Sequence, residues 1–231
     1  MSDDRYRFSF ETVAEQYERA RPLYADEAVA WAAERLGIGP GSRVLDLAAG
    51  TGKLTRQVAA LGADVVAVEP GDEMRSVLQR VLPRVEVLAG RAEEIPLPDA
   101  SVDAITVGQA FHWFDREPAL REMRRVVRPG GGFALLWNRW DADDPLLGAV
   151  DRLLRGLRPP AVDGLEEPYE ERTFRQRRPL TVDAIVEWAG STSGWVNASR
   201  DEQSRLEHEI RWLAEDYAGE VSIRTDVVLL S

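Results

Sequence analysis

Between Arg43 and Trp137, short apolar runs rich in β-branched residues alternate with amphipathic segments of helical periodicity. This alternation predicts βα units stacked into a parallel sheet, and the near-continuous apolar runs fit strands that are covered on both faces. Strands are expected at 43–48, 64–69, 84–88, 102–107 and 132–137. Crossover helices are expected at 54–61, 71–81 and 117–127, the last stopped by the Pro-Gly-Gly at 129–131. The predicted fold class is a doubly wound α/β sheet.

Further elements are predicted on both sides of this region. Upstream, 10–19 and 25–36 have helical character and are separated by Pro22, with Gly37 ending the second, which indicates an N-terminal helical cap. Downstream we expect a strand at 172–178, a helix at 182–189, and a helix that opens with a capping box at 199–202 and stops near Gly219. Apolar and mostly polar residues then alternate over 221–230, which predicts a final strand.

Length and composition limit the classes of function. With 231 residues and 44% hydrophobic content, the chain is expected to form a single domain over 1–231. A net charge of -11 disfavours a nucleic-acid partner. The chain has no cysteine, and its two histidines, His112 and His208, are far apart, so no metal site is expected. The N-terminus lacks an apolar signal region and no stretch approaches the roughly 20 apolar residues of a membrane span, so we expect a cytoplasmic protein without a membrane partner.

The stretch 44–55 runs from an apolar strand through a glycine turn into an amphipathic segment. Gly50 and Gly52 carry no Cβ atom, so a ligand can approach the backbone and the turn can adopt positive φ angles. The next strand ends at Glu69, whose carboxylate can accept hydrogen bonds from both hydroxyls of an adenosine ribose. Strand, glycine turn and acid together predict a nucleotide-binding loop.

Three kinds of cofactor compete for this loop. NTP hydrolysis is disfavoured because Lys53 is followed by Leu54 rather than Ser or Thr, and because no glycine stands at position 47. A dinucleotide such as NAD calls for a third glycine at position 55, where Thr55 stands instead. S-adenosylmethionine has no pyrophosphate and depends more on the glycine turn, so it fits the loop best.

Several segments together resemble class I S-adenosylmethionine-dependent methyltransferases of the type 11 group, which includes ubiquinone-biosynthesis and trans-aconitate methyltransferase-like enzymes. They are 45–52 (LDLAAGTG), Glu69, 92–99 (AEEIPLPD), 109–114 (QAFHWF) and 128–131 (RPGG). The resemblance implies a Rossmann-like seven-stranded sheet of order 3-2-1-4-5-7-6 with strand 7 antiparallel, which agrees with the alternating strand at 221–230. It also implies a helical lid over 1–40, a cofactor-binding core over 41–140, and substrate-side helices with the final strands over 141–231.

The resemblance also implies a set of contacts to S-adenosylmethionine. Asp46 and Gly50 are expected at the methionine moiety, Glu69 on the ribose, and Gln109 near the sulfonium. The family often has an aspartate at position 91 for the adenine amino group. Here Arg91 stands instead, so Glu93 or a backbone carbonyl takes that group, or adenine is held more loosely. The full set of expected cofactor contacts is Tyr17, Arg21, Asp46, Ala48, Gly50, Gly52, Glu69, Pro70, Met74, Ala92, Glu93 and Gln109.

Methyl transfer is an in-line displacement at an activated carbon, so positioning supplies much of the rate and no enzyme nucleophile is required. For an alcohol or phenol acceptor, His112 is the candidate catalytic base, or it anchors its loop through a backbone hydrogen bond. For a carboxylate acceptor, Arg21, Arg116 and Arg139 are available cations. The candidate acceptor contacts are Tyr24, Trp113, Arg116, Trp137 and Arg139.

The expected function is transfer of a methyl group to a small-molecule carboxylate, hydroxyl, amine or activated carbon, with S-adenosylhomocysteine as product. One alternative is a protein of the same fold that transfers no methyl group, such as a pericyclase or a cofactor-binding scaffold. The other is an NAD-dependent oxidoreductase. The sequence leaves open the acceptor, the atom that is methylated and the oligomeric state, for which a homodimer is one option.

Overall fold

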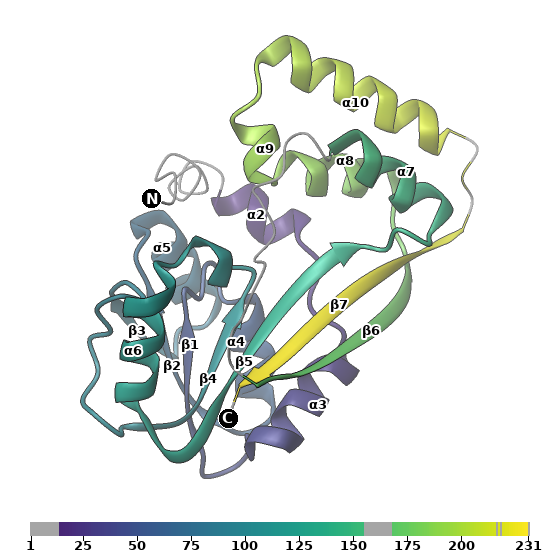
Figure 1. Cartoon of the computed structure of the whole chain (residues 1–231). Coiled ribbons are helices and arrows are strands. Elements are labelled where there is room, and N and C mark those ends of the chain that lie inside the picture. Colours follow the sequence, from purple (N-terminus) through teal and green to yellow (C-terminus); the bar gives the residue numbers. More distant parts are fainter. Residues whose placement is uncertain (1–13, 155–167, 216, 218, 231) are drawn as a thin grey trace.

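The computed structural model describes residues 14–154, 168–215, 217 and 219–230. A seven-stranded sheet of order β3-β2-β1-β4-β5-β7-β6 runs through the molecule, with helices on both faces and a helical cap above one end (Figure 1). β1 pairs in parallel with β2 and β4, and so do β2 with β3 and β4 with β5, whereas β7 is antiparallel to β5 and β6. The predicted fold class, strand order and antiparallel seventh strand are confirmed.

The strands form where the apolar runs predict them. They are β1 (Arg43–Leu47), β2 (Asp64–Glu69), β3 (Glu86–Ala89), β4 (Val102–Gly108), β5 (Val127–Trp140), β6 (Glu170–Pro179) and β7 (Glu220–Leu230). β1, β2 and β4 are buried over most of their length because helices cover both of their faces. All three end at or near the glycine loop, on the side where ligands bind in open α/β sheets.

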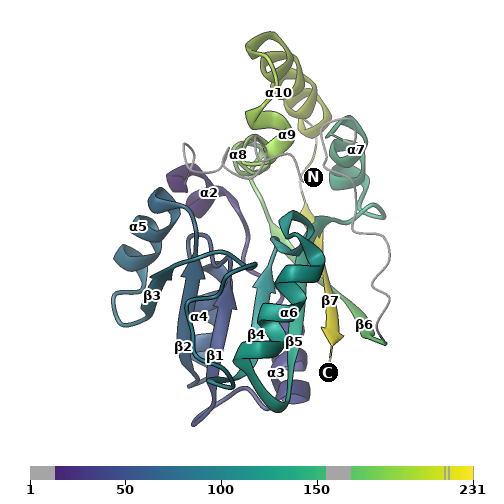
Figure 2. The same cartoon turned by 60° about the vertical axis from the view of Figure 1, so that its left-hand side comes forward.

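Helices pack on the two faces through separate apolar clusters. α3 (Asp26–Leu36) and α4 (Lys53–Ala60) share one cluster with Val44 and Val65 of the sheet. α6 (Arg116–Val126) covers the other face, together with Leu45 and Ile105, and Figure 2 shows it in front of β4 and β5. α5 (Asp72–Val81) packs beside β2 and β3 and contacts the short helix α2 (Ala14–Ala20).

The last three strands extend beyond the rest of the sheet and carry the helical cap (Figure 1). The cap consists of α7 (Pro145–Leu154), α8 (Val182–Gly190), α9 (Ser193–Val196) and α10 (Arg200–Ala214). Its core joins these helices to the outer ends of β5 and β7. At its centre Trp140 stacks on Trp188, with 4.0 Å between ring centroids. This second core stands over the edge of the sheet at which the glycine loop lies.

Some predicted boundaries were wrong, and α7 and α9 were not predicted. β5 starts at Val127, well before position 132, because Val127 pairs with Val102 and the Pro-Gly-Gly turn is an irregularity inside the pairing. α10 ends at Ala214 and not near Gly219, because the chain must turn back into β7. Residues 10–13 of the first predicted helix lie outside the described residues. The single domain expected from the length stays a prediction.

No helix in the described part of the chain combines the length and the apolar character needed to cross a bilayer.

Candidate functional site

The loop between β1 and α4 turns through left-handed backbone conformations. φ is 56° at Ala48, 58° at Gly50 and 88° at Gly52, which directly precedes α4. A Cβ atom placed on Gly50 would have no neighbour within 4 Å, so the space in front of its backbone is open. Ala48 adopts the same conformation although it is disfavoured for an L-residue by roughly 1–2 kcal/mol. The loop holds its backbone toward an open space, as a ligand-binding loop requires.

Glu69 ends β2 and ties the glycine loop to the start of α5. One carboxylate oxygen accepts a hydrogen bond from the Gly50 amide at 2.8 Å, and the other accepts one from the Gly71 amide at 2.9 Å. Burial raises the pKa of Glu69, although the two amides and Arg75 act in the opposite direction. Arg75 also donates to the carbonyl of Pro70 at 2.7 Å. Each Glu69 oxygen keeps a lone pair that can accept a ribose hydroxyl, and the contact with ribose stays a prediction.

Asp46 is fully buried in β1 beside this loop. Its carboxylate accepts hydrogen bonds from the hydroxyls of Thr55 and of Thr106, the latter at 3.0 Å. Burial raises its pKa to about 6, because the two threonines only partly offset desolvation. Among the described residues, no cation contributes to this shift or donates to the carboxylate. Thr55, which stands where a dinucleotide fold calls for glycine, therefore serves as a hydrogen-bond donor to Asp46.

The helix α2 lies on the glycine loop as a lid. The backbone carbonyl of Glu18 accepts a hydrogen bond from the Lys53 ammonium at 2.6 Å. Its carboxylate accepts one from the Thr51 hydroxyl at 2.6 Å and another from Arg56. One short helix is thus attached to the loop and to the first turn of α4.

The lid, the loop and the end of β4 enclose one pocket, lined among others by Tyr17, Tyr24, Asp46 and Gly50. Gly108, the last residue of β4, also lines it. A Cβ atom on Gly108 would lie 2.4 Å from the Tyr24 hydroxyl, so a side chain at this position would displace the tyrosine. The structure thereby brings together residues that the sequence assigned to the lid and to the methionine end of the cofactor.

The residues expected at the adenine follow Glu69 along the chain. Met74 is buried beneath α2, and Ala92 is buried in the sheet core. The Glu93 carboxylate accepts a hydrogen bond from the Asp115 amide at 3.0 Å and lies 3.6 Å from the Arg91 guanidinium. Glu93 is therefore engaged within the protein, and its contact with adenine stays a prediction.

Gln109 follows β4 in a left-handed conformation, with φ of 60°. Its side chain donates a hydrogen bond to the backbone carbonyl of Asn138 at 2.7 Å. The Asn138 side chain in turn donates to the carbonyls of Pro22 and Leu23, both at 3.1 Å. Gln109 thus joins β4 to β5 and, through Asn138, to the segment that follows the lid.

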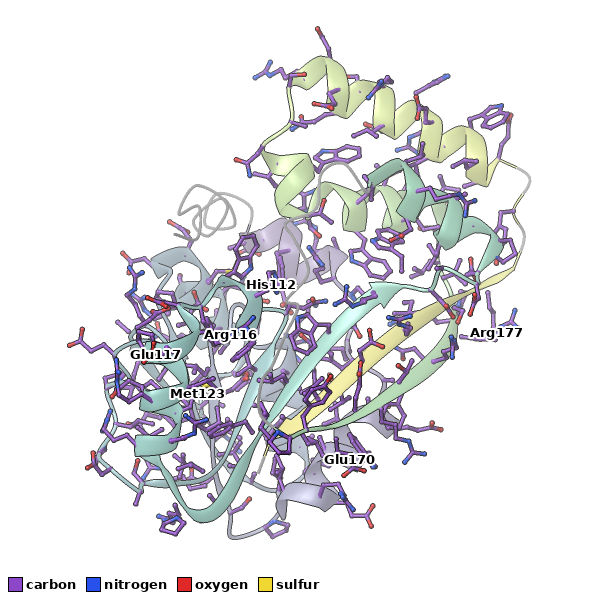
Figure 3. The ribbon with its side chains drawn as sticks, in the orientation of Figure 1. His112, Arg116, Glu117, Met123, Glu170 and Arg177 are labelled. Carbon is purple, nitrogen blue, oxygen red and sulfur yellow. The ribbon has the colours of Figure 1, made fainter. Side chains whose placement is uncertain are left out.

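His112 lies in a single 3-10 turn, Phe111–Trp113, after β4 (Figure 3). The Trp137 indole N–H donates to His112 Nδ1 at 3.4 Å, and the ring of Trp113 lies 4.6 Å away between centroids. Burial lowers the pKa of His112 to about 4, and the charges of Arg139 and Arg21 contribute. The hydrogen bond to the His112 ring comes from a side chain and not from the backbone. The role of His112 as a base stays a prediction.

The three arginines expected near an anionic acceptor have different partners. Arg21 donates to the Ser191 hydroxyl at 2.8 Å and to its carbonyl at 3.0 Å, at the end of α8. Arg139 lies on β5, with Nε 3.1 Å from the Asp226 carboxylate. Arg116 opens α6, and Figure 3 places it near His112 at the same edge of the sheet. Arg21 and Arg139 both act on His112 electrostatically, so these two belong to its surroundings.

Sequence reasoning missed several residues of this site. Thr106 is a polar residue in an apolar strand, and Gly108 is a glycine at a strand end, so both carried a local signal. Glu18 and Ser191 had none, because their partners are distant in the sequence and only the packing of α2 brings them together.

A sheet of this order, with a glycine loop after the first strand and an acid at the end of the second, defines the class I methyltransferases. Residues 45–135 match the family model of the methyltransferase domain. An uncharacterized methyltransferase of Mycobacterium tuberculosis is 38% identical over 210 residues, which are 89% of this chain and 85% of that one. The chain therefore belongs to the methyltransferase family and is an enzyme of the class I fold.

Two further proteins resemble it. A demethylmenaquinone methyltransferase of Mycobacterium sp. is 41% identical over 128 residues, or 53% of this chain and 54% of that one. The solved structure of a candidate type II methyltransferase from Anaeromyxobacter dehalogenans has a TM-score of 0.66 and 27% identity. The match covers 90% of this chain and 96% of the Anaeromyxobacter chain.

Proposed function

We propose that the protein transfers a methyl group from S-adenosylmethionine to a small-molecule acceptor and releases S-adenosylhomocysteine. The observation that carries the proposal is the buried Asp46 carboxylate, which faces the pocket without a cation. The ammonium of the methionine moiety complements this carboxylate. The pyrophosphate of NAD would be repelled by it, so the same observation argues against a dehydrogenase.

Other residues that line the pocket, and Glu69 beside it, fit the same cofactor. Gly50 leaves room for the ligand against its backbone, and Glu69 has lone pairs available for two ribose hydroxyls. Tyr17 and Tyr24 close the pocket from the lid side. When bound, S-adenosylmethionine supplies the electrophilic methyl carbon. The role of this chain is to hold that carbon in line with the acceptor and to exclude water.

A small-molecule acceptor is supported by the arrangement of the lid and the cap. The aromatic side chains of Trp113 and Trp137 are partly buried and contact His112. They offer an apolar surface next to the end of β4, where the acceptor must meet the methyl group. The whole chain carries a net charge of -11, which is unfavourable for a nucleic-acid acceptor.

Calorimetric titration with S-adenosylmethionine, S-adenosylhomocysteine and NAD tests the proposal. We expect micromolar binding of the first two, no binding of NAD, and a loss of at least about 100-fold in Glu69→Ala, which removes two charge-assisted hydrogen bonds to the ribose. The exposed Glu73→Ala on the next helix is the matched control and should bind normally. A preference for NAD, or unchanged affinity in Glu69→Ala, would contradict the proposal.

A screen of acceptors with labelled S-adenosylmethionine then tests the transfer itself. Release of S-adenosylhomocysteine that depends on an added acceptor supports a methyltransferase acting on a small molecule. Tight cofactor binding without any turnover across the screen would favour the alternative of a cofactor-binding scaffold.

A further inference from the structure

The ring of His112 is held by two tryptophans from different elements. Trp137 on β5 donates its indole N–H to Nδ1 at 3.4 Å, and Trp113 lies against the ring at 4.6 Å. Two tryptophans thus fix the orientation of one imidazole in the turn that follows β4, whose last residue, Gly108, lines the pocket.

The contact with Trp137 determines which nitrogen of His112 carries the proton. An indole N–H can only donate, so Nδ1 must accept and must present its lone pair to Trp137. In the neutral ring the proton then lies on Nε2. Because burial and the nearby arginines lower the pKa to about 4, the ring is neutral at pH 7. His112 therefore offers its surroundings an N–H and no free lone pair.

The charges of Arg139 and Arg21 both lower the pKa of His112, and Arg139 is also ion-paired with the Asp226 carboxylate on β7. Arg139 lies two positions after Trp137 on β5, so both side chains project from the same face of the strand. Arg21 follows α2, and within the described part of the chain its guanidinium donates to the hydroxyl and carbonyl of Ser191 and to no carboxylate. A neutral N–H donor beside two guanidinium groups is suited to an oxygen that carries negative charge.

We propose that His112 acts as a hydrogen-bond donor, through Nε2–H, to an acceptor that reaches the site with an anionic oxygen, and that it does not act as a base. The inference rests on the proposed function and narrows its acceptor to carboxylates and enolates. His112 holds the atom that does not react, which is the second oxygen of a carboxylate or the oxygen of an enolate.

The transfer then balances without a base. The nucleophilic oxygen of the carboxylate, or the carbon of the enolate, forms a bond to the methyl carbon. The bond between this carbon and sulfur breaks, and its electron pair stays on sulfur as neutral S-adenosylhomocysteine. The negative charge of the acceptor and the positive charge of the sulfonium cancel, and no proton has to leave.

The tautomer can be measured on the protein alone by long-range 1H–15N NMR of the imidazole groups. The chain has two histidines, so His208→Gln, a change at an exposed position of α10, assigns both sets of signals. We expect His112 to be neutral and protonated on Nε2 near pH 7, and to lose this strict preference in Trp137→Phe. A proton on Nδ1 in the unmodified protein would overturn the proposal, because Nε2 would then be free to act as a base.

The anion is tested with formate as the probe and neutral formamide as its matched control, in protein saturated with S-adenosylhomocysteine. Formate should shift the His112 Nε2 signal in a saturable way, formamide should not, and Arg139→Gln should weaken the response to formate. The absence of a formate response, or an equal response to formamide, would overturn the anionic acceptor.

Variants at His112 separate the two roles with any acceptor found in the screen. His112→Gln keeps an N–H donor and should retain activity within about tenfold, whereas His112→Phe should lose about 100-fold, as expected when a donor to a developing charge is removed. Equal losses in the two variants would refute the donor role. Because the tautomer measurement needs no cofactor, it stands even if calorimetry shows no S-adenosylmethionine binding.

Discussion

Buried carboxylates occur in two regions of this enzyme, the cofactor pocket and the junction between the sheet and the cap. In the pocket, Asp46 and Glu69 are buried with hydroxyl and amide donors, and desolvation raises the pKa of both. At the junction, burial also disfavours the charge of Asp141, but donors from Ser222, the Asp143 amide and Arg175 hold its pKa below the usual range. Asp141 at the junction is thus paired with a cation, Arg175, whereas no cation among the described residues acts on Asp46 in the pocket.

The direction of the pKa shift distinguishes carboxylates that stabilise the fold from carboxylates that are available to bind a ligand. An acid whose pKa is raised lowers the stability of the folded protein at neutral pH. Such a loss of stability is expected where a bound ligand supplies the cationic partner of the carboxylate. Buried acids with raised pKa values are common at functional sites. Substitutions in the two regions should therefore have opposite effects on stability, and only those in the pocket should lower cofactor affinity.

The largest loss of stability is expected from Asp144→Ala at the junction. One Asp144 oxygen accepts from the amides of Leu146 and Leu147 at the start of α7, and the other accepts from the Ser222 amide on β7 at 2.7 Å. Removing a helix cap and leaving a buried amide unsatisfied should lower the free energy of unfolding by about 3 kcal/mol. Thermal melts should show a decrease of about 6–12 °C.

Two controls accompany this variant. Asp143→Ala, an exposed neighbour, should change the melting temperature by less than about 2 °C. Cofactor affinity should be unchanged in Asp144→Ala. A parallel loss of affinity would mean that the two regions are not independent.

Asp46→Asn should have the opposite effect on stability. It removes a buried charge whose pKa is raised to about 6, and the Thr106 hydroxyl can rotate to accept from the new amide. We expect a gain of about 2 kcal/mol at pH 7, together with at least a tenfold loss of S-adenosylmethionine affinity. Denaturant titration and calorimetry on the same preparations measure both. A variant that is less stable and binds S-adenosylmethionine normally would contradict the proposed contact between Asp46 and the methionine ammonium.

Cofactor affinity should fall about tenfold between pH 7 and pH 5, because only an ionised Asp46 can hold the ammonium. The stability contribution runs the other way. The folded pKa of Asp46 lies above the unfolded value, so its contribution is favourable below about pH 4 and is lost as the pH rises through 6. Calorimetry across this range, with Asp46→Asn as the pH-independent reference, checks the first expectation. Equal pH dependence in both proteins would assign the titration to another group, such as Glu69.

The smallest effect is expected from Ala48→Gly. Glycine relieves the left-handed strain of roughly 1 kcal/mol at φ 56° but adds a similar amount of entropy to the unfolded chain. The net change should stay within about 0.5 kcal/mol, and cofactor binding should be unchanged. Ala48→Val, with a branched Cβ in the same conformation, should destabilise the protein by more than about 1 kcal/mol. Melting curves of the two variants, compared with the parent, test this contrast.

The two regions also differ in how far the sequence predicts them. The pocket was predictable because its signals are local: a strand, a glycine turn and a helix within 44–55, and an acid at the next strand end. The cap was harder to predict from the sequence. Asp144 followed by Pro145 is a helix-start signal for α7, but a run of acids in a loop has the same composition as a solvated surface.

Long-range packing explains most of what remained. β5 is extended on the cap side because β7 pairs with it as far as Trp140, and the contact of Trp140 with Trp188 joins residues far apart in the sequence. Neither pairing has a local signature. The hydrogen bonds from Thr51 and Lys53 to Glu18 also lack a local signature, because they depend on how α2 packs on the glycine loop.

The attachment of the lid has a practical consequence for chemical labelling. Lys53 is the single lysine of the chain, its side chain is 12% exposed, and its ammonium donates to the Glu18 carbonyl of the lid. An acylating reagent needs a free, deprotonated amine, so we expect slow reaction at this nitrogen while Glu18 holds it. Apart from the terminal amine, each chain can gain one acyl group, which intact mass counts without any engineered label. A ligand that keeps α2 on the glycine loop should slow this acylation further.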